Sequence, residues 1–186
     1  MTKQKVHAQN GLKSAFGDML LDLYSVVRPQ LNIMDGILGM EGHGPNSGDP
    51  IKMKLALAST NAMALDLAAC EIINVEPVHI PVYKRAKGRG MWPKKIEYPL
   101  LEPKQVMFKR FRLPGTATHI RTGKPASNKS PIITKKCIGC GHCETIYPKG
   151  AVKVKNEKAQ IDHKKCIRCF CCHEICPEGA IKLGNR

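Results

Sequence analysis

The chain has 186 residues, with 30 lysines and arginines against 15 aspartates and glutamates, so its formal net charge is +15. That length accommodates one domain or two small ones. No apolar run approaches the roughly 20 residues that cross a bilayer, and the N-terminus lacks the apolar core of a signal peptide. We therefore expect a cytoplasmic protein without a membrane span, whose thiols stay reduced, from a cell or compartment poor in oxygen.

The N-terminal part of the chain predicts a small layer of helices and strands. Residues 14–28 have helical spacing, with Leu20, Leu23, Tyr24 and Val27 at i, i+3, i+4 and i+7, and Pro29 ends the run. Short strands are predicted at 31–37 and 51–58, and a helix capped by Ser59 or Thr60 follows to about Ile73. This order of elements favours an α/β layer with parallel pairing. A layer of two strands and two helices is small for a self-sufficient core.

Between the two strands, residues 39–50 hold six glycines and prolines, which predicts a loop without regular structure. Loops at the ends of parallel strands bind ligands in α/β folds, so Asp35, Glu41, His43 and Asp49 are candidate ligand-binding residues. The alternative is a tight crossing whose acids are solvated. No dinucleotide or Walker fingerprint occurs here.

The middle of the chain is predicted to be irregular and is strongly basic. Residues 75–104 are rich in proline, lysine and glycine, 105–112 could form an edge strand, and 114–131 read as a basic linker. Residues 84–136 hold 15 basic residues against two acids. The scattered aromatics form no known nucleic-acid signature, so nucleic acid is the less favoured partner. A solvated basic loop, or a docking surface for an acidic redox protein, is favoured instead.

Two copies of one cysteine motif lie near the C-terminus, where eight of the nine cysteines fall. Each copy follows the pattern C-x2-C-x2-C-x3-(C)-P, the spacing with which bacterial ferredoxins bind cubane iron–sulfur clusters. The first copy places Tyr147 where its fourth cysteine should stand. Between the copies, residues 151–161 alternate and turn at Asn156–Glu157, which predicts a β-hairpin. Structural zinc is disfavoured, because seven ligands in two such runs exceed the four that zinc uses.

The ligands of the first predicted cluster are complete. Paired motifs exchange their last cysteines, so a [4Fe–4S] cluster is expected on Cys137, Cys140, Cys143 and Cys176. The second cluster would use Cys166, Cys169 and Cys172, with Tyr147 at the fourth position. Four outcomes stay open: ligation by Cys171, a non-cysteine ligand on the fourth iron, a [3Fe–4S] cluster, or an empty site.

Segments around residues 14–80 and 132–186 resemble the prokaryotic family called domain of unknown function 362. The resemblance rests on the run from Met19 to Pro50, on Leu57 to Cys70, and on the C-terminal motifs, since many members carry a two-cluster ferredoxin module there. Members are usually about twice this length, so the chain resembles the C-terminal half of one. The resemblance therefore implies an iron–sulfur protein. It also makes a separate chain that carries the N-terminal half of the family's domain one expected partner.

These observations lead to one expected architecture and two expected functions. The fold class is α+β: a small α/β domain, or a truncated one, at 1–113, a basic linker at 114–131, and a ferredoxin-type iron–sulfur domain at 132–186. The leading function is electron transfer by at least one [4Fe–4S] cluster, docking an acidic redox partner. The alternative is a redox enzyme subunit or maturation factor that binds a ligand at an open iron of the second cluster or at the 39–50 loop.

Overall fold

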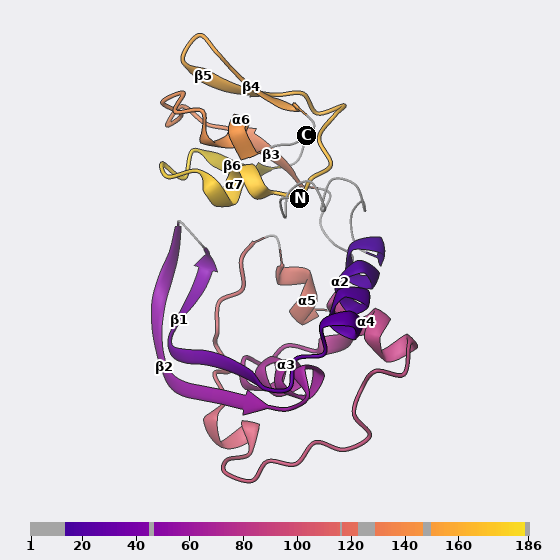
Figure 1. Ribbon diagram of the computed structural model, residues 1–186. Coiled ribbons are helices and arrows are strands. Elements are labelled where there is room, and N and C mark those ends of the chain that lie inside the picture. Colours follow the sequence, from indigo (N-terminus) through magenta and orange to yellow (C-terminus); the bar gives the residue numbers. More distant parts are fainter. Residues whose placement is uncertain (1–13, 45–46, 116, 123–128, 147–149, 185–186) are drawn as a thin grey trace.

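The computed structural model describes residues 14–44, 47–115, 117–122, 129–146 and 150–184 (Figure 1). Its α-helices are α2 (Ser14–Val27), α3 (Ala62–Ile72), α4 (Pro81–Gly88), α5 (Thr118–Thr122), α6 (His142–Ile146) and α7 (Cys171–Ile175). Two 3-10 turns are η1 (Pro77–His79) and η2 (Pro103–Val106). The strands are β1 (Asn32–His43), β2 (Ser47–Ser59), β3 (Ser130–Ile133), β4 (Val152–Lys155), β5 (Lys158–Ile161) and β6 (Ile181–Gly184). They form three two-stranded antiparallel sheets, which confirms the α+β class.

The predicted parallel pairing and the predicted 39–50 loop are both wrong, because β1 and β2 form one long antiparallel hairpin. Pairing continues through the glycine-rich stretch, from Gly39 opposite Ile51 to His43 opposite Ser47. The glycines make room for methionines within the strands. A Cβ on Gly39 would lie 2.8 Å from Met53 Sδ, and one on Gly48 would lie 2.6 Å from Met40 Cγ. Glycine content here reflects packing across the sheet rather than a break in it.

Helix α2 confirms the predicted helix but buries a different face. Leu21 is 2% exposed, whereas Leu23 and Val27 of the expected apolar stripe are 56% and 63% exposed. The helix packs on α4, where a Cβ on Gly17 would lie only 3.2 Å from Val82 Cα. The missing side chain at Gly17 therefore lets the two helices approach on the Leu21 side. Arg85 of α4 and Arg89, the residue that follows α4, pair with Asp18 and Asp22 of α2 along the rim of this contact.

Helix α3 begins one position later than predicted. Its N-cap is Asn61, whose side-chain oxygen accepts from the Ala64 amide at 3.1 Å, while Ser59 Oγ accepts from the Asn61 amide. Six of its residues are buried, and Met63 and Leu67 join Leu21 and Ala86 in one hydrophobic cluster. This cluster joins α2, α3 and α4 into the core of the N-terminal part.

The region after α3 is more ordered than its composition predicts. Residues 75–104 hold η1 and α4, and both begin with a proline in the first turn, where the missing N–H costs nothing. The edge strand expected at 105–112 is wrong. Glu102 and Gln105 form a capping box around η2, and the Phe108 amide then donates to Ile72 O at the end of α3. These local bonds satisfy the backbone groups that a strand partner would have used.

The C-terminal part is built from two small sheets around the cysteine motifs. The predicted hairpin is confirmed as β4 and β5, with Asn156 and Glu157 at φ of 49° and 58° in the turn, as a type I′ turn requires. Strand β3 pairs with β6, so the start and the end of this part lie side by side (Figure 1). Its core consists of three alanines, Val152, Ile181 and the buried thiols of Cys143, Cys172 and Cys176.

Candidate metal centre

The two cysteine motifs have the same backbone conformation at equivalent positions. In the first copy Gly139 and Gly141 have φ of 69° and 82°, and in the second Arg168 and Phe170 have φ of 55° and 61°. A short helix follows each loop, α6 in the first copy and α7 in the second. The structural repeat therefore matches the sequence repeat, and the second copy adopts the left-handed conformation without glycine.

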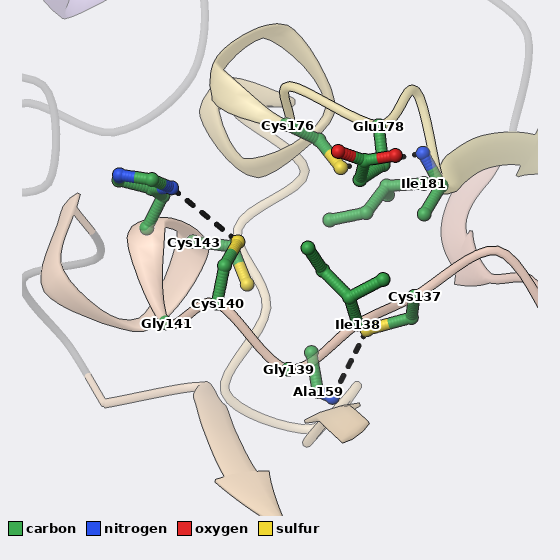
Figure 2. Close-up of a pocket in the computed structure, with 12 residues that line it drawn as sticks. Cys137, Ile138, Gly139, Cys140, Gly141, Cys143, Ala159, Cys176, Glu178 and Ile181 are labelled. Atoms are coloured by element: carbon green, nitrogen blue, oxygen red, sulfur yellow. Dashed lines mark hydrogen bonds between the residues drawn. The ribbon is translucent and has the colours of Figure 1, made fainter. Parts of the chain in front are cut away.

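Four cysteines of the predicted first cluster line a single hollow (Figure 2). Cys137 and Cys140 lie in the loop before α6, Cys143 lies in α6, and Cys176 comes from the chain directly after α7. The remaining lining is mostly apolar and includes Ile138 and Ile181. The geometry thus brings a cysteine of the second motif beside the three of the first.

Backbone amides donate to two of these sulfurs, and a histidine nitrogen lies beside a third. The Ala159 amide lies 3.4 Å from Cys137 Sγ, the Ala180 amide lies 3.2 Å from Cys176 Sγ, and His142 Nδ1 lies 3.3 Å from Cys140 Sγ (Figure 2). N–H donors to sulfur stabilise negative charge on thiolates and raise the reduction potential of a bound cluster. The fourth thiol, Cys143, is buried, and that burial raises its pKa.

The donor set is compatible with an iron–sulfur cluster. In a cubane each thiolate binds a different iron, so the four sulfurs surround the group instead of converging on one atom. Within the described ranges, no group of three or more His, Cys, Asp or Glu side chains is placed to hold a metal ion. Four soft thiols around a mostly apolar hollow are the ligand chemistry that iron–sulfur clusters require.

The second motif gathers three thiols next to the first site. Burial raises the pKa of Cys172 to about 12, and the nearby thiols of Cys169, Cys166 and Cys143 add to the rise. Cys143 of the first motif is thus close enough to influence Cys172 of the second. Tyr147, the residue at the fourth position, lies outside the described residues.

Cys171 occupies the position in the second motif that His142 occupies in the first. His142 Nδ1 lies 3.3 Å from the sulfur of Cys140, the second cysteine of its motif, and the Cys171 thiol lies 3.8 Å from the backbone oxygen of Cys169. Hydrogen bonding from the Cys171 thiol lowers the pKa of Cys169 to about 7, and the same bond raises the pKa of Cys171. In this arrangement the Cys171 thiol donates to the Cys169 carbonyl oxygen.

Replacing Arg168 by glycine should stabilise the C-terminal part by about 0.5 kcal/mol, because a left-handed backbone costs more for arginine than for glycine. Arg168 is exposed, so little packing is lost. Anaerobic thermal unfolding measures the change. The matched variant Lys164→Gly, at an exposed position without positive φ, should lower the midpoint instead. A lower midpoint for Arg168→Gly would contradict the argument.

The four candidate ligand-binding residues lie at two places on the β1–β2 hairpin. Glu41 and Asp49 are cross-strand partners near its tip, and His43 lies at the end of β1. Asp35 lies farther down β1, where its Oδ1 accepts from the Ile37 amide at 2.8 Å. The structure therefore brings three of the four together and separates Asp35 from them.

The two carboxylates at the hairpin tip are bound by Arg112, which the sequence did not single out. Arg112 Nε lies 2.7 Å from Glu41 Oε1, and its terminal nitrogen lies 2.7 Å from Asp49 Oδ2. The Arg112 amide also donates to Glu41 Oε2, and these bonds hold the pKa of Glu41 below its usual range. The acids thus fasten the hairpin to the segment after η2.

His43 reaches the second cysteine motif. Its Nδ1 lies 3.4 Å from His173 Nε2, and the two rings meet edge to face with centroids 5.3 Å apart. His173 lies in α7, next to Cys172, and its Nδ1 contacts Ile181 O. The hairpin tip therefore lies against the second motif, although 130 residues separate the two histidines. Nothing in the sequence pattern marks either residue as the partner of the other.

A larger hollow lies elsewhere, at the C-terminal end of α3. It has a volume of about 580 Å³, and its lining includes Glu71, Trp92, Lys94, Tyr98 and Arg121. Arg121 is held there by the carbonyls of Ile73 and Asn74. The lining mixes both signs of charge, and it contains none of the hairpin candidates.

Comparisons with known proteins support part of the expected resemblance. Residues 1–71 match the sequence model of the domain of unknown function 362. The thylakoid-associated protein sll1697 of Synechocystis sp. is 34% identical over 112 residues, which cover 59% of this chain and 35% of that protein. The chain thus spans about a third of the length of this curated relative. The match to the domain of unknown function 362 does not extend to the cysteine motifs. Among the described helices, none is long and apolar enough to cross a bilayer.

Proposed function

We propose that the protein transfers electrons through at least one [4Fe–4S] cluster held by Cys137, Cys140, Cys143 and Cys176. The observation that supports this most directly is that the four thiols, drawn from both motifs, line one hollow. Such a cluster supplies reversible one-electron chemistry. The second motif supplies three further thiols for a second cluster of atypical type, [4Fe–4S] or [3Fe–4S].

The protein's own residues would set the properties of this centre. The Ala159 and Ala180 amides donate to sulfur, and the buried positions of Cys143 and Cys176 limit access of water. Ile138 is 63% exposed beside the first ligand, so the centre lies close to the surface on that side. A centre near the surface can exchange an electron with a docked protein.

The docking face for an acidic redox partner would be the exposed segment around Lys135, Lys136 and Ile138. Other cations of the basic stretch already have partners within the chain, among them Arg85, Arg89, Lys95 and Arg112. These four paired side chains are therefore less available for docking than the sequence count indicates.

Reversing the charge of Lys135 and Lys136 should slow electron exchange with an acidic ferredoxin by about tenfold at low salt, because steering by opposite charge accelerates encounter. Stopped-flow mixing at two salt concentrations measures the rates. Lys94→Glu, an exposed lysine far along the chain, serves as the control and should change the rate little. Equal rates for all variants would remove this face from the proposal.

Metal content tests the proposed function directly. Protein purified without oxygen should contain about 4 iron per chain for one cluster, or about 7 or 8 for two, with matching sulfide. Electron paramagnetic resonance before and after dithionite should show a reduced cluster signal, and a signal in the oxidised state marks a three-iron cluster. Protein that binds zinc and no iron would overturn the proposal.

A second candidate function is ligand binding at the second motif, supported by the contact between His43 and His173. Because of this contact, the hairpin tip lies beside the second motif and could contribute side chains to a bound ligand. If the fourth iron there lacks a thiolate, added cyanide should shift the resonance signal of the second cluster. The Tyr147→Cys variant should abolish that shift, and an unaltered response would remove the open-iron idea.

A further inference from the structure

The hollow at the C-terminal end of α3 has the size and the lining of a small-molecule site. Its volume of about 580 Å³ falls within the range of ligand pockets, which is about 300–1,000 Å³. The cysteines proposed as cluster ligands are not part of its lining. Its apolar and aromatic lining includes Leu67, Val75, Trp92, Ile96, Tyr98 and Met107.

Two half-buried side chains of opposite charge, Glu71 and Arg121, line this hollow. Among the described residues, no ion pair includes either of them. Both charges are therefore available to a bound molecule. The other charged residues of the lining are exposed, so water competes for them: Glu76, Lys94 and Lys95.

The position of Glu71 is unfavourable for the helix that carries it. Glu71 lies in the last turn of α3, a turn without a basic residue, and there its charge meets the negative end of the helix dipole. Burial, together with the nearby carboxylate of Glu71, raises the pKa of Tyr98, so the carboxylate lies close to that ring. Residues that break a local rule of this kind are expected at functional sites. A ligand cation in the hollow would compensate Glu71.

Arg121 is held in place by the backbone rather than by an acid. Its Nε donates to Asn74 O at 3.2 Å, and a terminal nitrogen donates to Ile73 O at 2.9 Å. These bonds use two of the five N–H donors of the guanidinium group. The charge is thus fixed at the end of α3 with donors left for an anionic group.

Trp92 forms a rigid apolar wall of the hollow. Its Nε1 donates to Tyr83 O at 3.0 Å, and Lys87 Nζ lies 5.0 Å from the ring centroid. The ring also packs against the cluster that joins α2, α3 and α4. The orientation of the indole is therefore set before any ligand binds, which lowers the entropic cost of binding.

We propose that this hollow binds an α-amino acid with an apolar or aromatic side chain. The ammonium group of the ligand contacts Glu71, its carboxylate contacts Arg121, and its side chain packs on Trp92. An α-amino acid carries both charged groups on one carbon, so it can satisfy both side chains at once. A simple anion leaves Glu71 without a partner, and a simple amine leaves Arg121 without one. This binding site is separate from the proposed electron-transfer function.

Calorimetric titration of the full chain, purified without oxygen, tests the proposal with phenylalanine, leucine and methionine as probes. At least one of them should bind and change the fluorescence of Trp92, which is the single tryptophan of the chain. Analogues of the bound amino acid that lack the ammonium or the carboxylate group should each bind about tenfold more weakly, because one buried charge then lacks its partner. For phenylalanine these analogues are phenylpropionate and phenethylamine.

The Glu71→Gln variant should separate a ligand role from a structural one. It should weaken binding about tenfold and yet raise the thermal midpoint of the ligand-free protein by about 2 °C, because the unfavourable charge at the end of α3 is gone. Glu157→Gln, the same substitution at an exposed position in the β4–β5 turn, should leave binding unchanged.

Three outcomes would overturn the proposal. The first is that none of the three amino acids binds at millimolar concentration. The second is an analogue with one charged group that binds as tightly as the amino acid. The third is a Glu71→Gln variant with a lower midpoint and unaltered affinity, since Glu71 would then act only within the fold. Iron content should be equal in all samples, which keeps the result distinct from a failure of the electron-transfer proposal.

Discussion

The Cys176→Ser variant should lose the first cluster, about 4 iron per chain, while Cys137, Cys140 and Cys143 remain in place. Cys176 is buried beside these three thiols, and its sulfur receives the Ala180 amide. A serine hydroxyl is a poor substitute for a thiolate on iron. Iron and sulfide counts on anaerobically purified protein, together with the reduced resonance signal, measure the loss.

Cys171→Ser provides the matched control for this experiment. Cys171 lies in the second motif, close in sequence to Cys176, but it takes the position equivalent to His142, and its thiol donates to the Cys169 carbonyl oxygen. We therefore expect full iron content in this variant. If Cys171→Ser loses iron and Cys176→Ser keeps it, the assignment of the thiols to the two sites is wrong.

The Gly139→Ala variant should destabilise the C-terminal part by about 3 kcal/mol, from the left-handed backbone and from a steric clash together. Gly139 has a φ of 69°, and a Cβ there would lie 2.5 Å from the carbonyl oxygen of Glu157 in the β4–β5 turn. The loop between the first two ligands must therefore move or the hairpin must shift. Anaerobic urea unfolding measures the change in free energy of unfolding.

Gly141→Ala separates the two causes. Gly141 also has a left-handed backbone, with a φ of 82°, but a Cβ there would meet nothing within 4 Å. Only the conformational cost applies, so we expect a loss of about 1 kcal/mol. Equal losses for the two variants would show that the contact with Glu157 does not constrain the first motif.

The sequence predicted those features that depend on local pattern. Helix α2 follows from its apolar spacing and Pro29, and the β4–β5 hairpin follows from alternation around Asn156 and Glu157. The proximity of Cys176 to the first three cysteines follows from recognising the motif as a repeat. In each case the residues that determine the structure lie in one short stretch of sequence or in two copies of it.

Features that depend on distant contacts were not predictable. Glycines in 39–50 indicated a loop, because the sequence does not show that Met40 and Met53 would fill the space above them. The buried face of α2 depends on Gly17 and its approach to α4. Arg112 and His173 were missed as partners of the hairpin tip, since nothing local distinguishes them from other basic residues.

Each cysteine motif depends on residues from the other half of the C-terminal part, and this limits how that part can be divided. Although the sequence is a tandem repeat, neither repeat is an autonomous unit: the first lacks a fourth thiol without Cys176, and β3 finds its partner in β6. Excising either half would leave an incomplete ligand set and an unpaired strand. We therefore expect the duplication to behave as a single cooperative unit, and we expect a cut between Gly150 and Cys166 to leave neither half with the complete set of thiols proposed for the first cluster.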